Sequence, residues 1–294
     1  MRRARKPGAL VALKLALTLA LPLALAGCGH QSTQRQQVAA YVRHVGTIEG
    51  KLAKPVLAVT RAGGQFAAAG RKSAPLTEAQ ARALEQTLVQ SQAQIEAQGR
   101  KLRMLHEPPA AGNLHSLVLR FTDGEVALTH QLAQMVAFLP RFNAELTPLG
   151  PAATRLAAVL SKRQAFGAAA VAALFAAKAK ALRTFAATTT QTVTRLRLLS
   201  PPPVLKPQFE AQLGSLRGMG ASAGRLADAL ASGVSTNVAP LLTAFDRAAA
   251  ATHTPAARRA QTVAVRAYNA RITRLAALAQ AIARERLRLS NSLT

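Results

Sequence analysis

Apolar residues recur along much of the chain at alternating steps of three and four, a spacing that keeps them on one face of an α-helix. The pattern is most complete over residues 77–106 and returns over 175–199 and 265–289, so it predicts three long amphipathic helices. The three faces consist of Ala81, Leu84, Leu88, Ser91, Ile95, Gln98, Leu102 and Leu105; of Phe175, Lys178, Leu182, Phe185, Thr189, Thr192, Leu196 and Leu199; and of Val265, Tyr268, Ile272, Leu275, Ala279, Ile282, Arg286 and Leu289.

Capping residues and prolines indicate where these helices begin and end. Thr77 and Gln80 have the spacing of a capping box, in which each side chain accepts a hydrogen bond from the other residue's backbone amide. Pro108-Pro109 and Pro201–Pro203 end the first two long helices, because proline has no amide donor to continue a helix. Joints this short predict that the flanking helices fold back as antiparallel neighbours.

Matched landmarks indicate a threefold internal repeat. A proline opens the segment before each long helix, and the last leucine of that helix follows 50, 51 and 49 residues later. Repeats near this period are typical of arrays of helical units. The three pairs are Pro55 with Leu105, Pro148 with Leu199, and Pro240 with Leu289.

We therefore expect an all-α, elongated helical bundle built from three weakly similar three-helix repeat units with coiled-coil-like packing and one shared core. The expected divisions are a signal segment (1–27), a polar tether (28–36) and repeat units at 37–106, 107–200 and 201–294. The expected helices are 37–53, 55–69, 77–106, 112–139, 148–161, 165–199, 206–232, 240–252 and 256–290.

The amino terminus has the parts of a secretory signal. A basic start (residues 1–6) precedes an apolar run (15–26), which closes on Leu25-Ala26-Gly27-Cys28. These four residues resemble the lipobox of bacterial lipoproteins. The resemblance implies that Cys28, the only cysteine, becomes the first mature residue, carries a diacylglycerol on its thiol, and anchors the chain to the extracytoplasmic face of the membrane. The competing interpretation is an ordinary signal peptide or short membrane helix, although the run is short for the ~20 residues that a span needs.

Charge is strongly and unevenly positive. The chain has 38 Lys and Arg against 12 Asp and Glu, a formal net charge of +26, and only five of the basic residues lie in residues 1–27. From Leu146 to Gln208 there is no acid but nine basic residues. An acidic medium could favour the same bias without any ligand.

Four basic residues fall on the arc opposite the 175–199 apolar face: Lys180, Arg183, Arg195 and Arg197. They are expected to point outward, as a solvated face or as a contact for anionic lipid headgroups or an anionic envelope polymer. Nucleic acid is disfavoured, because no aromatic residues for base stacking are interleaved with these charges. Lys178 lies within the apolar face itself, where we expect its stem to run along the core and its amine to reach water.

Catalytic and metal-binding patterns are not recognisable. His106 and His115 flank the Pro108-Pro109 joint with Glu107 between them, but no further ligands stand at a metal-binding spacing, so surface histidines are favoured over a metal site. Hydrolase motifs and a Gly-rich phosphate loop are missing from the sequence. We expect no catalytic residues, no metal and no cofactor.

Three functions remain open. The favoured one is a non-catalytic envelope lipoprotein that acts as a helical scaffold or binding module. The second is an extracytoplasmic carrier that holds a small apolar ligand in a helical cleft, which a sizeable apolar pocket would support. The third is an enzyme whose site is assembled from distant residues, which titratable groups gathered in a cleft would support. The sequence identifies no protein partner.

Overall fold

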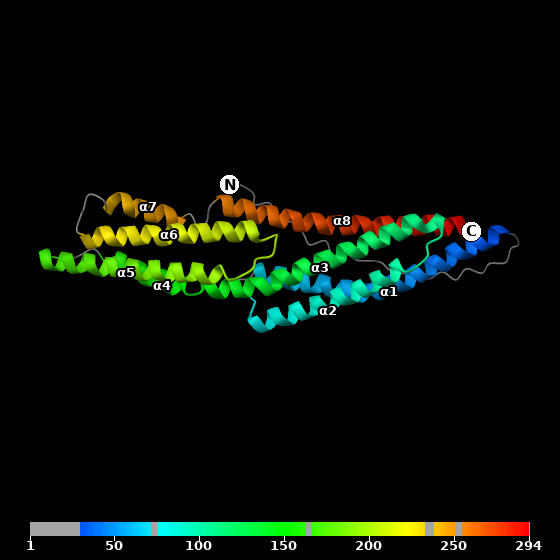
Figure 1. Ribbon diagram of the computed structural model, residues 1–294, viewed down its shortest axis with the longest axis horizontal. Helices are drawn as coiled ribbons and strands as arrows, with labels where there is room; N and C mark the ends of the chain where they lie inside the picture. The colour runs from blue at the N-terminus through cyan, green and yellow to red at the C-terminus, as the bar shows by residue number, and fades with distance from the viewer. Residues whose placement is uncertain (1–29, 72–75, 163–165, 233–237, 251–254, 294) are drawn as a thin grey trace, which may run out of the picture. The chain divides into compact units, whose positions relative to one another are not determined.

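The computed structural model describes residues 30–71, 76–162, 166–232, 238–250 and 255–293 (Figure 1). Over these residues the chain consists of α-helices and one short 3₁₀ turn (Pro109–Ala111), with no strand, which confirms the all-α prediction. The helices are α1 (His30–Arg71), α2 (Glu78–Arg103), α3 (Gly112–Leu146), α4 (Leu149–Leu160), α5 (Ala168–Leu196), α6 (Lys206–Ser232), α7 (Val238–Ala250) and α8 (Pro255–Leu293).

The main departure from the expected helices is at prolines. Residues 37–53 and 55–69 form the single helix α1, which also takes in residues 30–36 of the expected tether, and Pro55 lies inside it. Pro140 likewise lies inside α3, which runs to Leu146 instead of 139. An interior proline costs about 3 kcal/mol in an isolated helix. Packing offsets this cost in α1, because Pro55 is buried together with Val56 on the same side of the helix.

The predicted capping box at the start of α2 is present. The backbone amide of Gln80 donates to Thr77 Oγ1 over 3.2 Å, and the amide of Thr77 donates to Gln80 Oε1 over 3.1 Å. Two amides that the first helical turn leaves without backbone partners are thereby satisfied.

Both proline joints reverse the chain, as expected. Across the first joint, a Cβ on Gly99 of α2 would lie 3.0 Å from Thr122 of α3, and Arg103 pairs with Asp123. Across the second, a Cβ on Gly220 of α6 would lie 3.3 Å from Thr189 of α5. The helices before and after each joint therefore lie side by side, as in an antiparallel helix pair.

Contacts divide the chain into two compact units. The first unit takes Met1–Arg61, Gln90–Thr129 and Ala270–Thr294, and the second takes Ala62–Val89 and His130–Asn269. Helices α1, α2, α3 and α8 contribute residues to both units. The division into three repeat units along the sequence stays a prediction.

In the first unit, parts of α1, α2, α3 and α8 pack around an apolar core, and some polar side chains are buried as well. Val45, Ile95, Leu102, Leu114 and Val118 are fully buried. A Cβ on Gly124 of α3 would lie 2.7 Å from Leu275 of α8, so these two helices approach closely. Three carboxyl side chains are also buried in this unit, those of Glu49, Glu125 and Glu285.

In the second unit, α5 packs on α6, α6 on α7, and α4 on α5 (Figure 1). The core contains Leu182, Leu196 and Leu216, each less than 2% exposed. Aromatic rings fill its wider parts: Phe138 of α3 lies 5.8 Å from Phe209 of α6, and Phe185 lies 6.2 Å from Phe245, measured between ring centroids.

The apolar faces expected from the sequence are largely the buried faces. Every described member of the 81–105 face is buried or half-buried, and so are Tyr268 to Leu289 of the third face, Val265 lying outside the described side chains. Phe175 is the exception, with 40% of its surface exposed. Its helix partner α6 ends at Ser232, and Asp228 of α6 already lies opposite Arg183, so α5 extends past α6 at its amino-terminal end. Lys178 is half-buried there, and the position of its amine stays a prediction.

Candidate functional site

The expected lipid-attachment residue, Cys28, lies outside the described residues, as does the whole signal segment. Its modification therefore stays a prediction. Among the helices that the structure describes, none has the length and apolarity needed to cross a membrane.

The four basic residues singled out by the sequence are all exposed on α5 and the residue that caps it. Two of them face acids from other helices. Arg183 Nη2 lies 3.1 Å from Asp228 Oδ1 of α6, and Arg195 Nη1 lies 3.9 Å from Glu145 Oε2 of α3. Residues 146–208 contain no acid in the sequence, but acids from outside this stretch lie beside two of its arginines. Pairs exposed to this extent are weak, so both arginines remain available to an external anion.

These residues form two sites rather than one patch. Lys180 and Arg183 line a groove near the start of α5, whereas Arg197 lines a cleft at the end of that helix. The 12 residues from Arg183 to Arg195 span about 18 Å at 1.5 Å per residue. An anionic partner that engages all four must therefore be an extended surface or polymer, since a small molecule cannot reach both ends.

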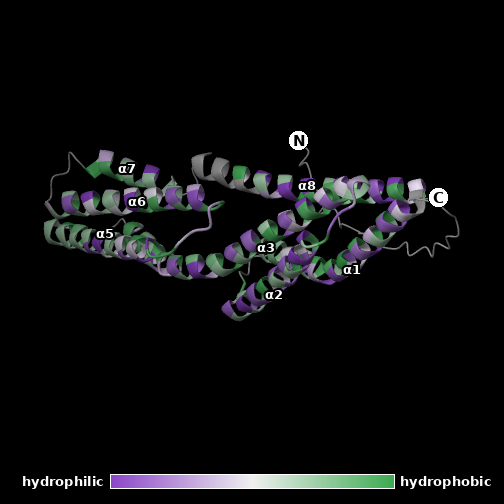
Figure 2. Ribbon diagram, turned by 45° about the vertical axis from the view of Figure 1, so that its right-hand side comes forward, coloured by the Kyte–Doolittle hydropathy of each residue, from purple (hydrophilic) through white to green (hydrophobic). Residues whose placement is uncertain are grey.

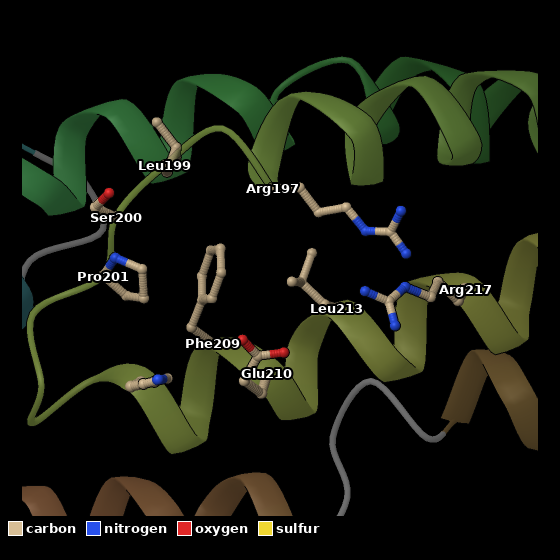
Figure 3. Close-up of a pocket in the computed structure, with 9 residues that line it drawn as sticks. Arg197, Leu199, Ser200, Pro201, Phe209, Glu210, Leu213 and Arg217 are labelled. Atoms are coloured by element: carbon tan, nitrogen blue, oxygen red, sulfur yellow. The ribbon is translucent and has the colours of Figure 1, made fainter.

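The cleft at the second proline joint has a volume of 310 Å³ and mixes basic and apolar side chains. Figure 3 shows the guanidinium groups of Arg197 and Arg217 facing the same opening from α5 and α6. Phe209 and Leu213 form its buried wall. Arg217 was not among the residues expected from the sequence; the antiparallel hairpin predicted at Pro201–Pro203 is the signal that could have placed it beside Arg197.

The groove near the start of α5 is larger, at 580 Å³, and mostly apolar. Ala172, Phe175 and Ala176 of α5 line one side, and Leu230 and Ala231 of α6 line the other. The basic side chains of Lys180 and Arg183 lie at its edge. The carrier hypothesis requires a sizeable apolar pocket, whereas this groove is open to solvent, so that hypothesis stays a prediction.

The two histidines at the first proline joint do not come together as ligands. His115 Nδ1 lies 2.7 Å from the Tyr41 hydroxyl, and its Nε2 lies 4.0 Å from Glu107. Burial raises the pKa of the Tyr41 phenol, and the carboxylates of Glu107 and Glu49 raise it further. His106 is exposed. Across the described ranges, no group of three or more His, Cys, Asp and Glu residues is arranged to hold a metal ion.

The three buried carboxyl groups of the first unit have different environments. Glu49 Oε2 lies 2.8 Å from Arg286 Nη1, yet burial outweighs this cation and raises the pKa of Glu49. The pKa of Glu285 is lowered by hydrogen bonds from Arg288 and Asn113. For Glu125, burial is the cause that raises the pKa, to about 7. Glu125 was not singled out from the sequence, because its burial depends on side chains from other helices.

Comparison with known proteins finds no matching family model, no matching curated protein and no matching solved structure.

Proposed function

We propose that this chain is a bacterial envelope lipoprotein, anchored through Cys28 to the extracytoplasmic face of the membrane, and that it acts as a non-catalytic helical scaffold or binding module. The observation that carries the proposal is the sequence Leu25-Ala26-Gly27-Cys28 behind a basic start and an apolar run. Cys28 is the only cysteine, and it stands where lipid attachment would use it.

The position of the first helix supports this proposal. Helix α1 begins at His30, two residues after Cys28. A lipid on Cys28 would therefore tether the start of α1 to the bilayer surface. For a tethered chain, even weak attraction to that surface acts at a high effective concentration.

The exposed basic residues supply that attraction. Lys180, Arg183, Arg195 and Arg197 would contact anionic headgroups or an anionic envelope polymer, with the effect limited to a Debye length of about 8 Å at physiological salt. Arg183 and Arg195 also form ion pairs with Asp228 and Glu145, which weakens their attraction to an external anion. The contact would therefore orient a tethered domain but would not hold an untethered one tightly.

Replacing Cys28 with Ser tests the anchor. The change removes the thiol that would carry the diacylglycerol and with it the proposed lipid anchor. We expect the wild-type chain to take up a fatty-acid probe and to sediment with membranes, and the Cys28→Ser chain to take up none.

Thr33→Cys in the Cys28→Ser chain is the matched control, because it restores a thiol five residues from the lipobox position without restoring the lipobox. Labelling of this control to the wild-type level, or a wild-type chain without label, contradicts the proposal.

The groove at the start of α5 favours one second candidate, the carrier of a small apolar ligand. Its volume of 580 Å³ is within the usual range for ligand pockets, about 300–1,000 Å³. Ligand pockets usually enclose most of their ligand, whereas this groove is open, so the membrane-bound module is the better-supported proposal.

A further inference from the structure

The amino-terminal end of α5 exposes an uninterrupted apolar segment. Residues 166–177 read FGAAAVAALFAA, without a polar side chain. Apart from half-buried Leu174, all of them are exposed, including 87% of the surface of Phe166 and 36% of Val171. Figure 2 colours this end of α5 as hydrophobic. A helix that is apolar all round is normally buried in protein or lipid.

Within the second unit, the side chains of this segment other than Leu174 stay exposed, although α4 and α6 both pack on α5. Helix α6 packs along α5 only as far as its own end at Ser232. Beyond that point the groove of 580 Å³ opens between Phe175 and Leu230. The apolar surface of α5 therefore continues beyond the end of α6.

The charges next to the segment are positive. Lys180 and Arg183 follow Phe175 by one to two helical turns and are exposed at the edge of the groove. Lysine and arginine at the boundary of an apolar helical surface are typical of helices that lie in the interface of an anionic membrane. Their long stems can run along apolar surface while the charges reach phosphate groups.

The length of the segment fits an interfacial position and not a span. Its ten helical residues, 168–177, extend about 15 Å, whereas the hydrocarbon core of a bilayer is about 30 Å thick. A second copy of this chain is a poorer occupant, because it would bring two basic edges together in a protein with a net charge of +26.

We infer that residues 166–177 dock in the boundary between headgroups and acyl chains of an anionic phospholipid bilayer, with Lys180 and Arg183 against the lipid phosphates. This inference rests on the proposed lipoprotein function, which brings the domain to the membrane. The inference goes beyond that function in two ways. It selects the bilayer rather than an envelope polymer as the partner, and it assigns residues 166–177 as the segment that enters the bilayer.

The sequence permits a clean test, because the chain contains no Trp. Phe175→Trp places a single fluorophore in the docking segment. Leu198→Trp is the matched control, because Leu198 is 81% exposed and adjoins another basic residue at the opposite end of α5. Each full-length chain is reconstituted on phosphatidylglycerol vesicles whose acyl chains carry bromine, which quenches tryptophan only at short range.

We expect quenching at position 175 to exceed quenching at position 198 at least about threefold, because only the apolar segment has a reason to leave water. The difference should shrink on phosphatidylcholine vesicles and in a Lys180→Gln, Arg183→Gln chain. Val171→Gln in the Phe175→Trp chain should lower the quenching further, while Val89→Gln, on the 53%-exposed Val89 of α2, should leave it unchanged.

Equal quenching at both positions, on vesicles that still carry the chain, overturns the inference and leaves the anchor intact. Failure of the chain to float with vesicles counts against the proposed function instead.

Enhancement of the tryptophan signal of the Phe175→Trp chain by a monomeric fatty acid without vesicles assigns the groove to the carrier function. Binding of soluble polyphosphate by Lys180 and Arg183, without acyl-chain quenching, assigns these charges to a polymer. Either of the last two results overturns membrane docking.

Discussion

At the scale of single residues, the scarce acids are the most informative. The chain has only 12 Asp and Glu, yet three glutamates are buried in the first unit. Arg286 and Arg288 accompany two of them, and both contacts come from α8. Burial raises the pKa of Glu125, so the folded protein binds the proton of this carboxyl group more tightly than the unfolded chain does. A buried carboxyl without a cation lowers stability once it ionises.

Glu125 should therefore give the protein a defined pH dependence. Its pKa is about 7 in the folded state and 4.5 as the reference for the unfolded chain. Because the folded pKa is the higher one, its favourable contribution is complete below pH 4.5 and is lost as pH rises to about 7. The loss is about 3 kcal/mol, at 1.36 kcal/mol per pKa unit. Glu125→Gln should remove this slope and raise the free energy of unfolding above pH 7, as measured by urea denaturation at several pH values.

Glu210→Gln is the control for that measurement, because Glu210 is exposed on α6. It should retain the wild-type loss of stability between pH 4.5 and 7. Burial also raises the pKa of Glu49, so Glu125→Gln should keep part of that loss. If it keeps the whole loss, burial does not raise the pKa of Glu125 as described.

At the scale of helices, the sequence indicates where a helix begins and ends better than it indicates which helices pack together. The capping box at Thr77 and the joints at Pro108-Pro109 and Pro201–Pro203 act through local backbone hydrogen bonding, so they were predictable. Pro55 was misjudged, because packing of α1 outweighs the local penalty of an interior proline. Phe175 was misjudged for the opposite reason: a three-and-four spacing identifies an apolar face but does not say whether another helix covers it.

The pairing of α5 with α6 can be tested at two glycines of the same helix. A Cβ on Gly220 would lie 3.3 Å from Thr189 Cγ2, whereas a Cβ on Gly218 would meet nothing within 4 Å. Gly220→Leu should lower the free energy of unfolding by about 1–3 kcal/mol through overpacking. Gly218→Leu should raise it by up to about 1 kcal/mol, because Leu favours a helix more than Gly does.

Both values come from thermal or urea denaturation, and the intrinsic helix preference is common to the two substitutions. Their difference therefore isolates the contact between α5 and α6. Equal effects at Gly218 and Gly220 would mean that the two helices do not approach closely at Thr189.

At the scale of the whole molecule, the sequence shows the class of fold and the imbalance of charge but not how charges pair. The acid-free stretch predicted an exposed basic surface. The four basic residues expected to point outward from α5 are exposed. Asp228 and Glu145 come from outside the stretch, so their ion pairs with Arg183 and Arg195 depend on helix packing that spacing does not encode. Arg217 escaped notice for the same reason.

Lipid attachment at Cys28 is the feature on which the proposed function depends, and mass spectrometry of the mature amino terminus tests it most directly. The protein is taken from membranes of its native host or of a bacterium that processes lipoproteins. We expect cleavage between Gly27 and Cys28 and an amino-terminal Cys28 that carries a diacylglycerol. A mature chain that begins at any other residue, or an amino-terminal Cys28 without lipid, contradicts the proposal.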